Sequence, residues 1–183
     1  MKNKLSLFVL MLVLSSFSES DLKRDTKKYP EPEGIDNLLF YVQRTINSNT
    51  IVYTLNQDVN GTINEQEPIS AFWVKFAQGG KKEQLTYVQK KYAYGLRSKL
   101  LDKDKGVFMV EFVSYDKKQL YLIKSVHDNK YHVYSFVKNR LSIIRSIFVQ
   151  IEGGSFWLPN VKYVELTAID PNNSSVLTEM IKP

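Results

Sequence analysis

Residues 107–152, VFMVEFVSYDKKQLYLIKSVHDNKYHVYSFVKNRLSIIRSIFVQIE, decide the fold class of this chain. Aromatic and β-branched residues alternate there with polar ones, which is the two-residue period of a half-buried β-strand. Only short turns such as HDNK and KNR separate the runs. Connections this short join antiparallel neighbours, so residues 96–152 predict an up-and-down meander of about five strands.

The same alternation continues on both sides of the meander. Three runs precede it and two follow it: LLFYVQR (38–44), TIVYTLN (50–56), ISAFWVKF (69–76), VKYVELTAID (161–170) and SVLTEMI (175–181). We therefore expect one all-β, mainly antiparallel domain over residues 37–183, built as a closed barrel or sandwich of about nine or ten strands.

A single short α-helix is expected between the strands. In KKEQLTYVQKKYA (81–93), Leu85, Val88 and Tyr92 recur at helical spacing and predict the face that docks on the sheet. Gly95 follows where a left-handed C-terminal cap belongs, so we expect it to have a positive φ. The helix would then pack across one end of the barrel.

The run ISAFWVKF carries large apolar side chains on both faces, with Phe72 on one face and Trp73 on the other. A strand that is apolar on both faces is normally covered on both. Since the expected helix is the nearest available cover, we predict that Trp73 or Phe72 contacts one of its apolar residues, Leu85, Val88 or Tyr92.

The first twenty residues, MKNKLSLFVLMLVLSSFSES, have the pattern of a secretory signal peptide. Lys2 and Lys4 precede an apolar run that ends at Leu14, and small residues follow. That run is too short to span a bilayer, which needs roughly 20 apolar residues, so we expect residues 1–20 to be cleaved and no transmembrane segment in the mature chain. Residues 21–36 are charged and rich in proline, which predicts a flexible leader.

Composition limits the classes of partner. The chain contains no cysteine, so it has no disulfide and cannot be a lipoprotein, and export would place it in the periplasm or outside the cell. Its formal charge of +6 comes from lysines scattered over turns and strands, which favours a solvated surface over a nucleic-acid interface. No cofactor is expected.

Several stretches resemble, in order and spacing, exported bacterial proteins of the domain of unknown function family 4833. They are NTIVYTLN with the Asn-Gly turn that follows, PISAFWVKFAQGG, LTYVQKKYAYGL and GGSFWLPNVKYVEL. Asn49, Tyr53, Pro68, Trp73 and the triplet at residues 93–95 carry most of the likeness. The resemblance implies a single secreted domain and assigns it no activity.

No catalytic or metal-binding constellation stands out. His127 and His132 could bind a metal together with Asp128, but zinc sites normally use three or four well-placed ligands, and we expect surface or packing histidines instead. Glu111 and Glu165 interrupt apolar strands and could act as an acid and base inside a barrel, which leaves a hydrolase as the alternative function. We expect them to face solvent or to pair with lysines.

Aromatic residues near the expected helix form the best candidate ligand site: Trp73, Tyr87, Tyr92, Tyr94 and Trp157. Tyrosine and tryptophan offer both apolar area and a hydrogen-bonding group, which suits a cavity rim. The leading hypothesis is an exported, non-enzymatic binding or interaction module of the bacterial cell envelope, whose partner is an apolar or mixed small molecule or an envelope protein. A purely structural envelope protein is a further alternative.

Overall fold

The computed structural model describes residues 29–155 and 158–182, and the expected signal peptide lies outside these ranges. The described residues form eleven strands in one sheet. In chain order they are β1 (Leu38–Arg44), β2 (Asn47–Leu55), β3 (Ile69–Lys75), β4 (Lys81–Gln84), β5 (Leu96–Asp102), β6 (Val107–Phe112), β7 (Tyr115–Lys124), β8 (Tyr131–Val137), β9 (Arg140–Gly154), β10 (Pro159–Ile169) and β11 (Val176–Ile181). The meander predicted over residues 96–152 is present as β5 to β9.

The sheet is mixed, because one of its pairings is parallel. Strands follow one another in the order β4-β3-β2-β1-β9-β8-β7-β6-β5, and β10 and β11 extend from β9. Residues 41–44 of β1 run parallel to residues 146–149 of β9. The other strand pairings in the described part of the chain are antiparallel. The expectation of a mainly antiparallel sheet therefore holds only in part.

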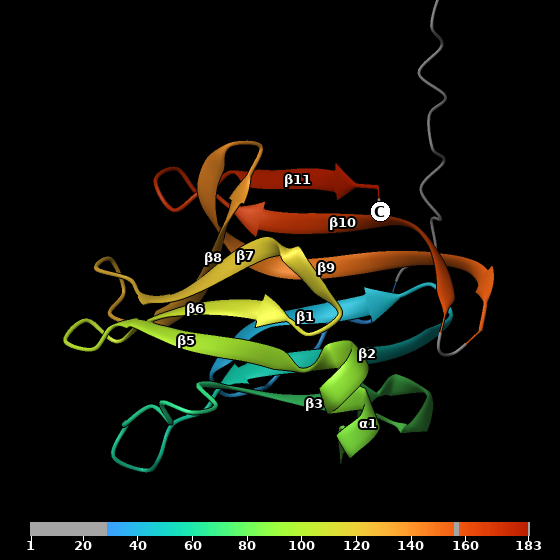
Figure 1. The fold of residues 1–183 in the computed structure, drawn as a ribbon, viewed down its shortest axis with the longest axis horizontal. Coiled ribbons are helices and arrows are strands. Elements are labelled where there is room, and N and C mark those ends of the chain that lie inside the picture. The colour runs from blue at the N-terminus through green and yellow to red at the C-terminus, as the bar shows by residue number, and fades with distance from the viewer. Residues whose placement is uncertain (1–28, 156–157, 183) are drawn as a thin grey trace, which may run out of the picture.

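The sheet curls into a half-barrel and does not close (Figure 1). The long strand β9 pairs with β10 along one edge, while β8 and then β1 share its other edge. Because β9 has three neighbours, the sheet branches there, and within the described residues the outer strands β4 and β5 each pair with one neighbour only. The prediction of a closed barrel is accordingly corrected to a curled, branched sheet.

The main core lies inside the curl. Its fully buried side chains come from strands on opposite sides of the half-barrel and include Phe40, Ile51, Tyr53, Phe108, Leu120, Leu122, Val133 and Ile144. A second, smaller cluster of Tyr41, Val52 and Val74 lies on the outer face of β1 to β3, with Phe72 packed against it. Strand β3 is thus covered on both faces, as its sequence predicts.

The cover of the outer face is not the helix. Ile35, Leu38 and Phe76 pack against the outer cluster beside Phe72. Trp73 points to the opposite, inner side and belongs to the main core together with Leu85. On this inner face Trp73 shares the core with Leu85, one of the three predicted partners, and its hydrogen bond to the helical region is made to Gln89.

The expected helix is shorter than its apolar spacing suggests. Gly79 and Gly80 adopt φ values of 67° and 80°, which turn the chain back so that residues 81–84 pair with β3 as a strand. A short 3-10 turn, η1 (Phe76–Gln78), precedes them. The expected helix itself begins only after Thr86 and consists of α1 (Tyr87–Gln89) and the π-helical turn η2 (Lys90–Tyr94). We call residues 87–94 the helical segment.

The start of the helical segment is fixed by a capping box. The Thr86 side chain accepts a hydrogen bond from the Gln89 backbone N–H at 3.2 Å, and the Gln89 side chain accepts one from the Thr86 N–H at 3.0 Å. The docking face predicted for the helix is mostly wrong, because Leu85 is buried whereas Val88 and Tyr92 are exposed.

Gly95 ends the helical segment in an extended conformation with φ −68°, so the predicted left-handed cap is wrong. Glycine is nevertheless required by close packing. A Cβ atom at this position would lie 1.9 Å from the Lys90 carbonyl oxygen.

The expected leader, residues 21–36, is described only from Tyr29 onward. Tyr29 is buried, its ring lies 5.4 Å from that of Phe148, and its hydroxyl donates to the Thr45 carbonyl at 3.2 Å. Gln43 donates to the Pro30 carbonyl at 2.8 Å. The last part of this stretch therefore lies along the sheet.

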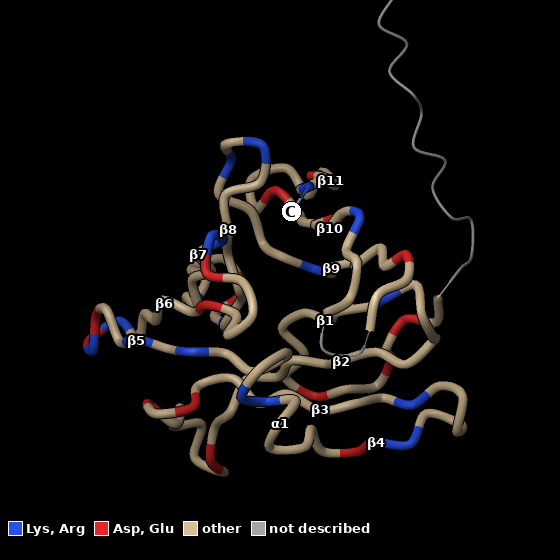
Figure 2. The backbone as a smooth tube through the Cα atoms, turned by 45° about the vertical axis from the view of Figure 1, so that its right-hand side comes forward, with Lys and Arg blue, Asp and Glu red and all other residues tan. Residues whose placement is uncertain are grey.

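Lys and Arg positions are spread over many of the strands and turns (Figure 2). Among the described residues, no helix is both long and apolar enough to cross a membrane.

Candidate ligand-binding site

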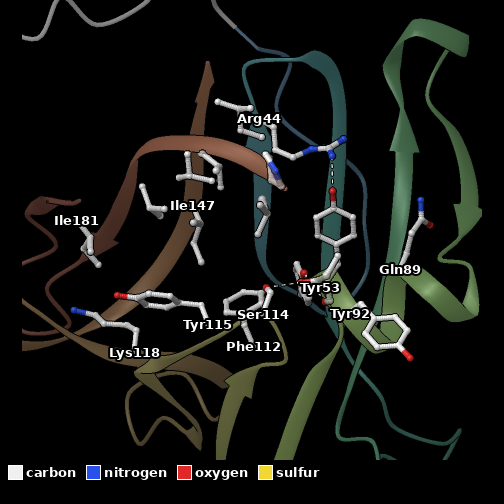
Figure 3. A pocket seen from close by; sticks show the side chains of 18 of the residues that line it. Arg44, Tyr53, Gln89, Tyr92, Phe112, Ser114, Tyr115, Lys118, Ile147 and Ile181 are labelled. Carbon is white, nitrogen blue, oxygen red and sulfur yellow. Dashed lines mark hydrogen bonds between the residues drawn. The ribbon is translucent and has the colours of Figure 1, made fainter. Parts of the chain in front are cut away.

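A cavity of about 480 Å³ lies inside the half-barrel. Its walls come from β1 and β2 on one side and from β9, β10 and β11 on the other, with β6, β7 and the helical segment completing it. Most of the lining is aliphatic or aromatic and includes Val42, Phe112, Ile147, Val149, Leu166 and Ile181. The chamber is thus mainly apolar, and its polar groups include Arg44, Lys118 and several tyrosine hydroxyls (Figure 3).

Arg44 is the principal polar group of the chamber. It ends β1 on the same face as the buried residues Phe40 and Val42, so strand alternation directs its side chain inward. Only 8% of the residue is exposed. Its guanidinium carbon lies 4.8 Å from the centre of the Trp73 ring and 5.3 Å from that of Tyr94, so the cation lies against both aromatic rings.

The charge of Arg44 has no acidic partner among the described residues. Its Nη1 donates to the Tyr94 hydroxyl, and its buried Nε has no hydrogen-bond acceptor. Burial lowers the pKa of Arg44 from its ordinary value, while the neighbouring Tyr94 acts in the opposite direction. Arginine nevertheless stays protonated in proteins, so the chamber contains a buried cation that no described residue compensates.

Tyr53 anchors the chamber beside this cation. It is fully buried, stacks on Phe40 at a centroid distance of 4.4 Å and donates its hydroxyl to the Tyr94 carbonyl at 2.8 Å. Burial raises the pKa of Tyr53 well above its ordinary value, with Tyr94 adding to the rise and Arg44 opposing it. The phenol is therefore neutral at physiological pH and does not offset the charge of Arg44.

Lys118 is a second cation in the chamber wall, and its charge is paired. Its Nζ lies 2.8 Å from a carboxylate oxygen of Glu179 and donates to the Phe136 carbonyl at 2.6 Å. Figure 3 shows Lys118 and Arg44 on different sides of the chamber, with apolar side chains such as Ile147 between them. Lys118 thus has a counter-ion, whereas Arg44 has none among the described residues.

The helical segment forms one rim of the chamber and is tied down at several points. Trp73 donates its indole N–H to the Gln89 side chain at 3.3 Å, and Ser114 donates to the Ala93 carbonyl at 2.6 Å. Tyr92 lines the chamber yet is 58% exposed, so the chamber reaches solvent beside this residue.

Two of the five predicted ligand-site residues line the chamber, namely Tyr92 and Tyr94. Trp73 does not line the chamber, but its ring packs against the Arg44 guanidinium group. Tyr87 is 73% exposed and lies outside the lining. Trp157 falls outside the described residues.

Sequence reasoning missed Arg44 and Tyr53 as site residues. The sequence does contain a signal for Arg44, because in LLFYVQR it lies on the same alternating face as the apolar residues that point inward. Charged side chains are seldom buried on such a face. Tyr53 looks like any other aromatic strand residue, and only the tertiary structure brings it to Tyr94.

The candidate carboxylates lie away from the chamber. Glu111 forms an ion pair with the exposed Arg97 at 3.4 Å and does not line the cavity. Glu165 is buried, but it lies between Val164 and Leu166 on β10, whose side chains line the chamber, so it faces the other side of the sheet. The two carboxylates therefore do not meet in one cavity.

The histidines do not converge either. His132 lies 2.7 Å from a carboxylate oxygen of Asp128. Across residues 29–155 and 158–182, no three potential ligand side chains gather around a site that could hold a metal ion.

The sequence model of a family described as "Domain of unknown function (DUF4833)" matches residues 40–179. This match covers most of the chain and all but the ends of the sheet, and the chain belongs to this family. No curated protein and no solved structure shows significant similarity to it.

Proposed function

We propose that this DUF4833 domain is an exported, non-enzymatic binding module of the bacterial cell envelope that holds a small, largely apolar molecule inside its half-barrel. The observation that carries the proposal is the chamber of about 480 Å³ with its mainly apolar lining. Small-molecule sites typically enclose about 300–1,000 Å³ and combine apolar walls with a few placed polar groups.

The energetics of packing support occupancy of the chamber. Protein interiors are close-packed, and each Å³ of apolar void costs about 24 cal/mol in core mutants. A chamber that leaves Val42, Ile147 and Leu166 without close neighbours on one side forgoes dispersion contacts. A ligand that fills it restores those contacts, which is the driving force we assign to binding.

A binding role is favoured over the hydrolase alternative by the location of the acidic residues. Glu111 and Glu165 lie outside the chamber wall, and the polar groups that do line it are cations, hydroxyls and an amide. Export to the envelope rests on the signal-peptide pattern of residues 1–20.

Binding of N-phenyl-1-naphthylamine, an uncharged apolar dye that fluoresces in apolar surroundings, tests the proposal. Ile181 lines the chamber from β11, so Ile181→Trp should fill part of it and weaken dye binding at least tenfold. Val176 lies on the same strand but is 66% exposed, and Val176→Trp is the matched control that should bind as the unaltered protein does. Absence of dye binding to the unaltered protein, or equal binding by both variants, would contradict the proposal.

A further inference from the structure

We infer that the molecule held in the chamber is an acid: its apolar body lies against Ile147 and Leu166, and its carboxylate binds Arg44. This inference rests on the proposed binding function and adds the chemical class of the ligand.

The first argument is the unpaired charge. Arg44 is more than nine-tenths buried, and its described neighbours Trp73, Tyr94 and Tyr53 bring no carboxylate to it. A buried charge is ordinarily paired, because removing it from water is costly unless an opposite charge replaces the lost hydration. No carboxylate from the described residues reaches Arg44, and we assign the missing partner to a bound anion.

The second argument is the contrast with Lys118. This lysine also lines the chamber, but Glu179 and the Phe136 carbonyl already occupy its ammonium group. An anionic ligand would gain little at Lys118 and much at Arg44. The charge pattern therefore selects the Arg44 side of the chamber for the carboxylate and sets the orientation of the bound ligand.

The third argument is the set of free donors. Arginine carries five N–H donors, and the described residues accept from one of those of Arg44, the Nη1 that donates to the Tyr94 hydroxyl. Because that hydroxyl oxygen accepts from Arg44, its own O–H remains available to donate toward a ligand oxygen, and Tyr94 lines the chamber. A guanidinium and a phenol together can hold one carboxylate.

The fourth argument is preorganisation. Trp73 and Tyr94 lie within 5.3 Å of the Arg44 guanidinium carbon, and the Gln89 amide oxygen fixes the Trp73 indole. The cation is therefore held in place before the ligand arrives, which lowers the entropy cost of binding. One fixed cation with apolar walls suits a monoanion better than a phosphate ester, which normally meets several cationic donors.

Two probes of matched shape test the inference on the full, processed protein. 1-Pyrenebutyric acid and 1-pyrenebutanol share the same apolar body and differ in the carboxylate. A charge-assisted hydrogen bond contributes enough to make the acid bind about 10- to 100-fold more tightly than the alcohol at neutral pH. Equal affinity for both probes would overturn the acid assignment and leave the binding function intact, whereas failure of both probes to bind would overturn the binding function itself.

Variants locate the carboxylate. Arg44→Met should remove the preference for the acid while retaining the alcohol, and Arg44→Lys should keep part of that preference. Arg97→Met removes the same charge from an exposed position outside the chamber and should leave the preference unchanged. If Lys118→Met abolishes the preference and Arg44→Met does not, the carboxylate lies at the other side and the assignment is wrong. The comparison of the two probes on unaltered protein needs no variant, so the test stands even if Arg44→Met fails to fold.

Discussion

Trp73→Ala is the substitution that most strongly tests how the chamber is held together. Trp73 is buried in the main core, donates to Gln89 and lies edge-on to Tyr94 at a centroid distance of 5.4 Å. It also lies 4.8 Å from the guanidinium carbon of Arg44. Removing the indole therefore affects the core, the helical segment and the cation at once.

The expected loss follows from these contacts. Truncating a buried tryptophan to alanine costs about 3–5 kcal/mol, which includes the cavity left behind. For a domain of this size, each kcal/mol lowers the melting temperature by about 2–4 °C, so we expect a decrease of roughly 6–20 °C. The assay is chemical denaturation at equilibrium, with the melting temperature as a second readout.

Phe72→Ala is the matched control. Phe72 is the neighbouring residue on β3, but it packs against the outer cluster and does not face the chamber. It should lower stability without changing ligand preference, whereas Trp73→Ala should weaken both stability and the preference for acidic probes. A loss below about 1 kcal/mol for Trp73→Ala, well under the usual range for a buried tryptophan, would refute the packing argument.

Three further predictions concern a backbone contact, pH and export. Gly95→Ala should lower the unfolding free energy by at least about 1–3 kcal/mol, because the added Cβ meets the Lys90 carbonyl oxygen; an unchanged denaturation midpoint would show that the chain does not approach itself there. Burial raises the pKa of the Tyr53 hydroxyl, so above about pH 10 the unfolded chain loses this proton first and the unfolding free energy falls by up to about 1.4 kcal/mol per pH unit. The unfolding free energy of Tyr53→Phe should fall less steeply above this pH, and an equal slope for both proteins would contradict the prediction. N-terminal sequencing of protein from its native host should begin between residues 17 and 23, and an intact Met1 would contradict export.

Strand periodicity in the sequence predicted most of the sheet. The five strands of the meander alternate clearly, and short turns leave antiparallel pairing as the remaining choice. The parallel contact between β1 and β9 was not predictable in this way. It joins residues about a hundred positions apart, and nothing in the local pattern of residues 38–44 specifies which distant strand lies beside them.

The helical segment shows where periodicity misleads. Leu85, Val88 and Tyr92 have helical spacing, but Gly79 and Gly80 return the chain to β3 and make residues 81–84 a strand. Turn geometry therefore prevailed over apolar spacing.

The candidate site could be predicted only in part. Aromatic residues near the rim were visible in the sequence, and Tyr92 and Tyr94 do line the chamber. Whether an inward-facing arginine such as Arg44 has a carboxylate partner depends on residues brought close by the fold, so the sequence alone could not show that its charge is unpaired.

A crystal structure of the processed protein with 1-pyrenebutyric acid tests the central claim most directly. The account predicts density for the pyrene inside the half-barrel, with a carboxylate oxygen within about 3 Å of a guanidinium nitrogen of Arg44. Density for the acid outside the chamber, or a chamber that contains only water while the acid is bound elsewhere, would contradict it.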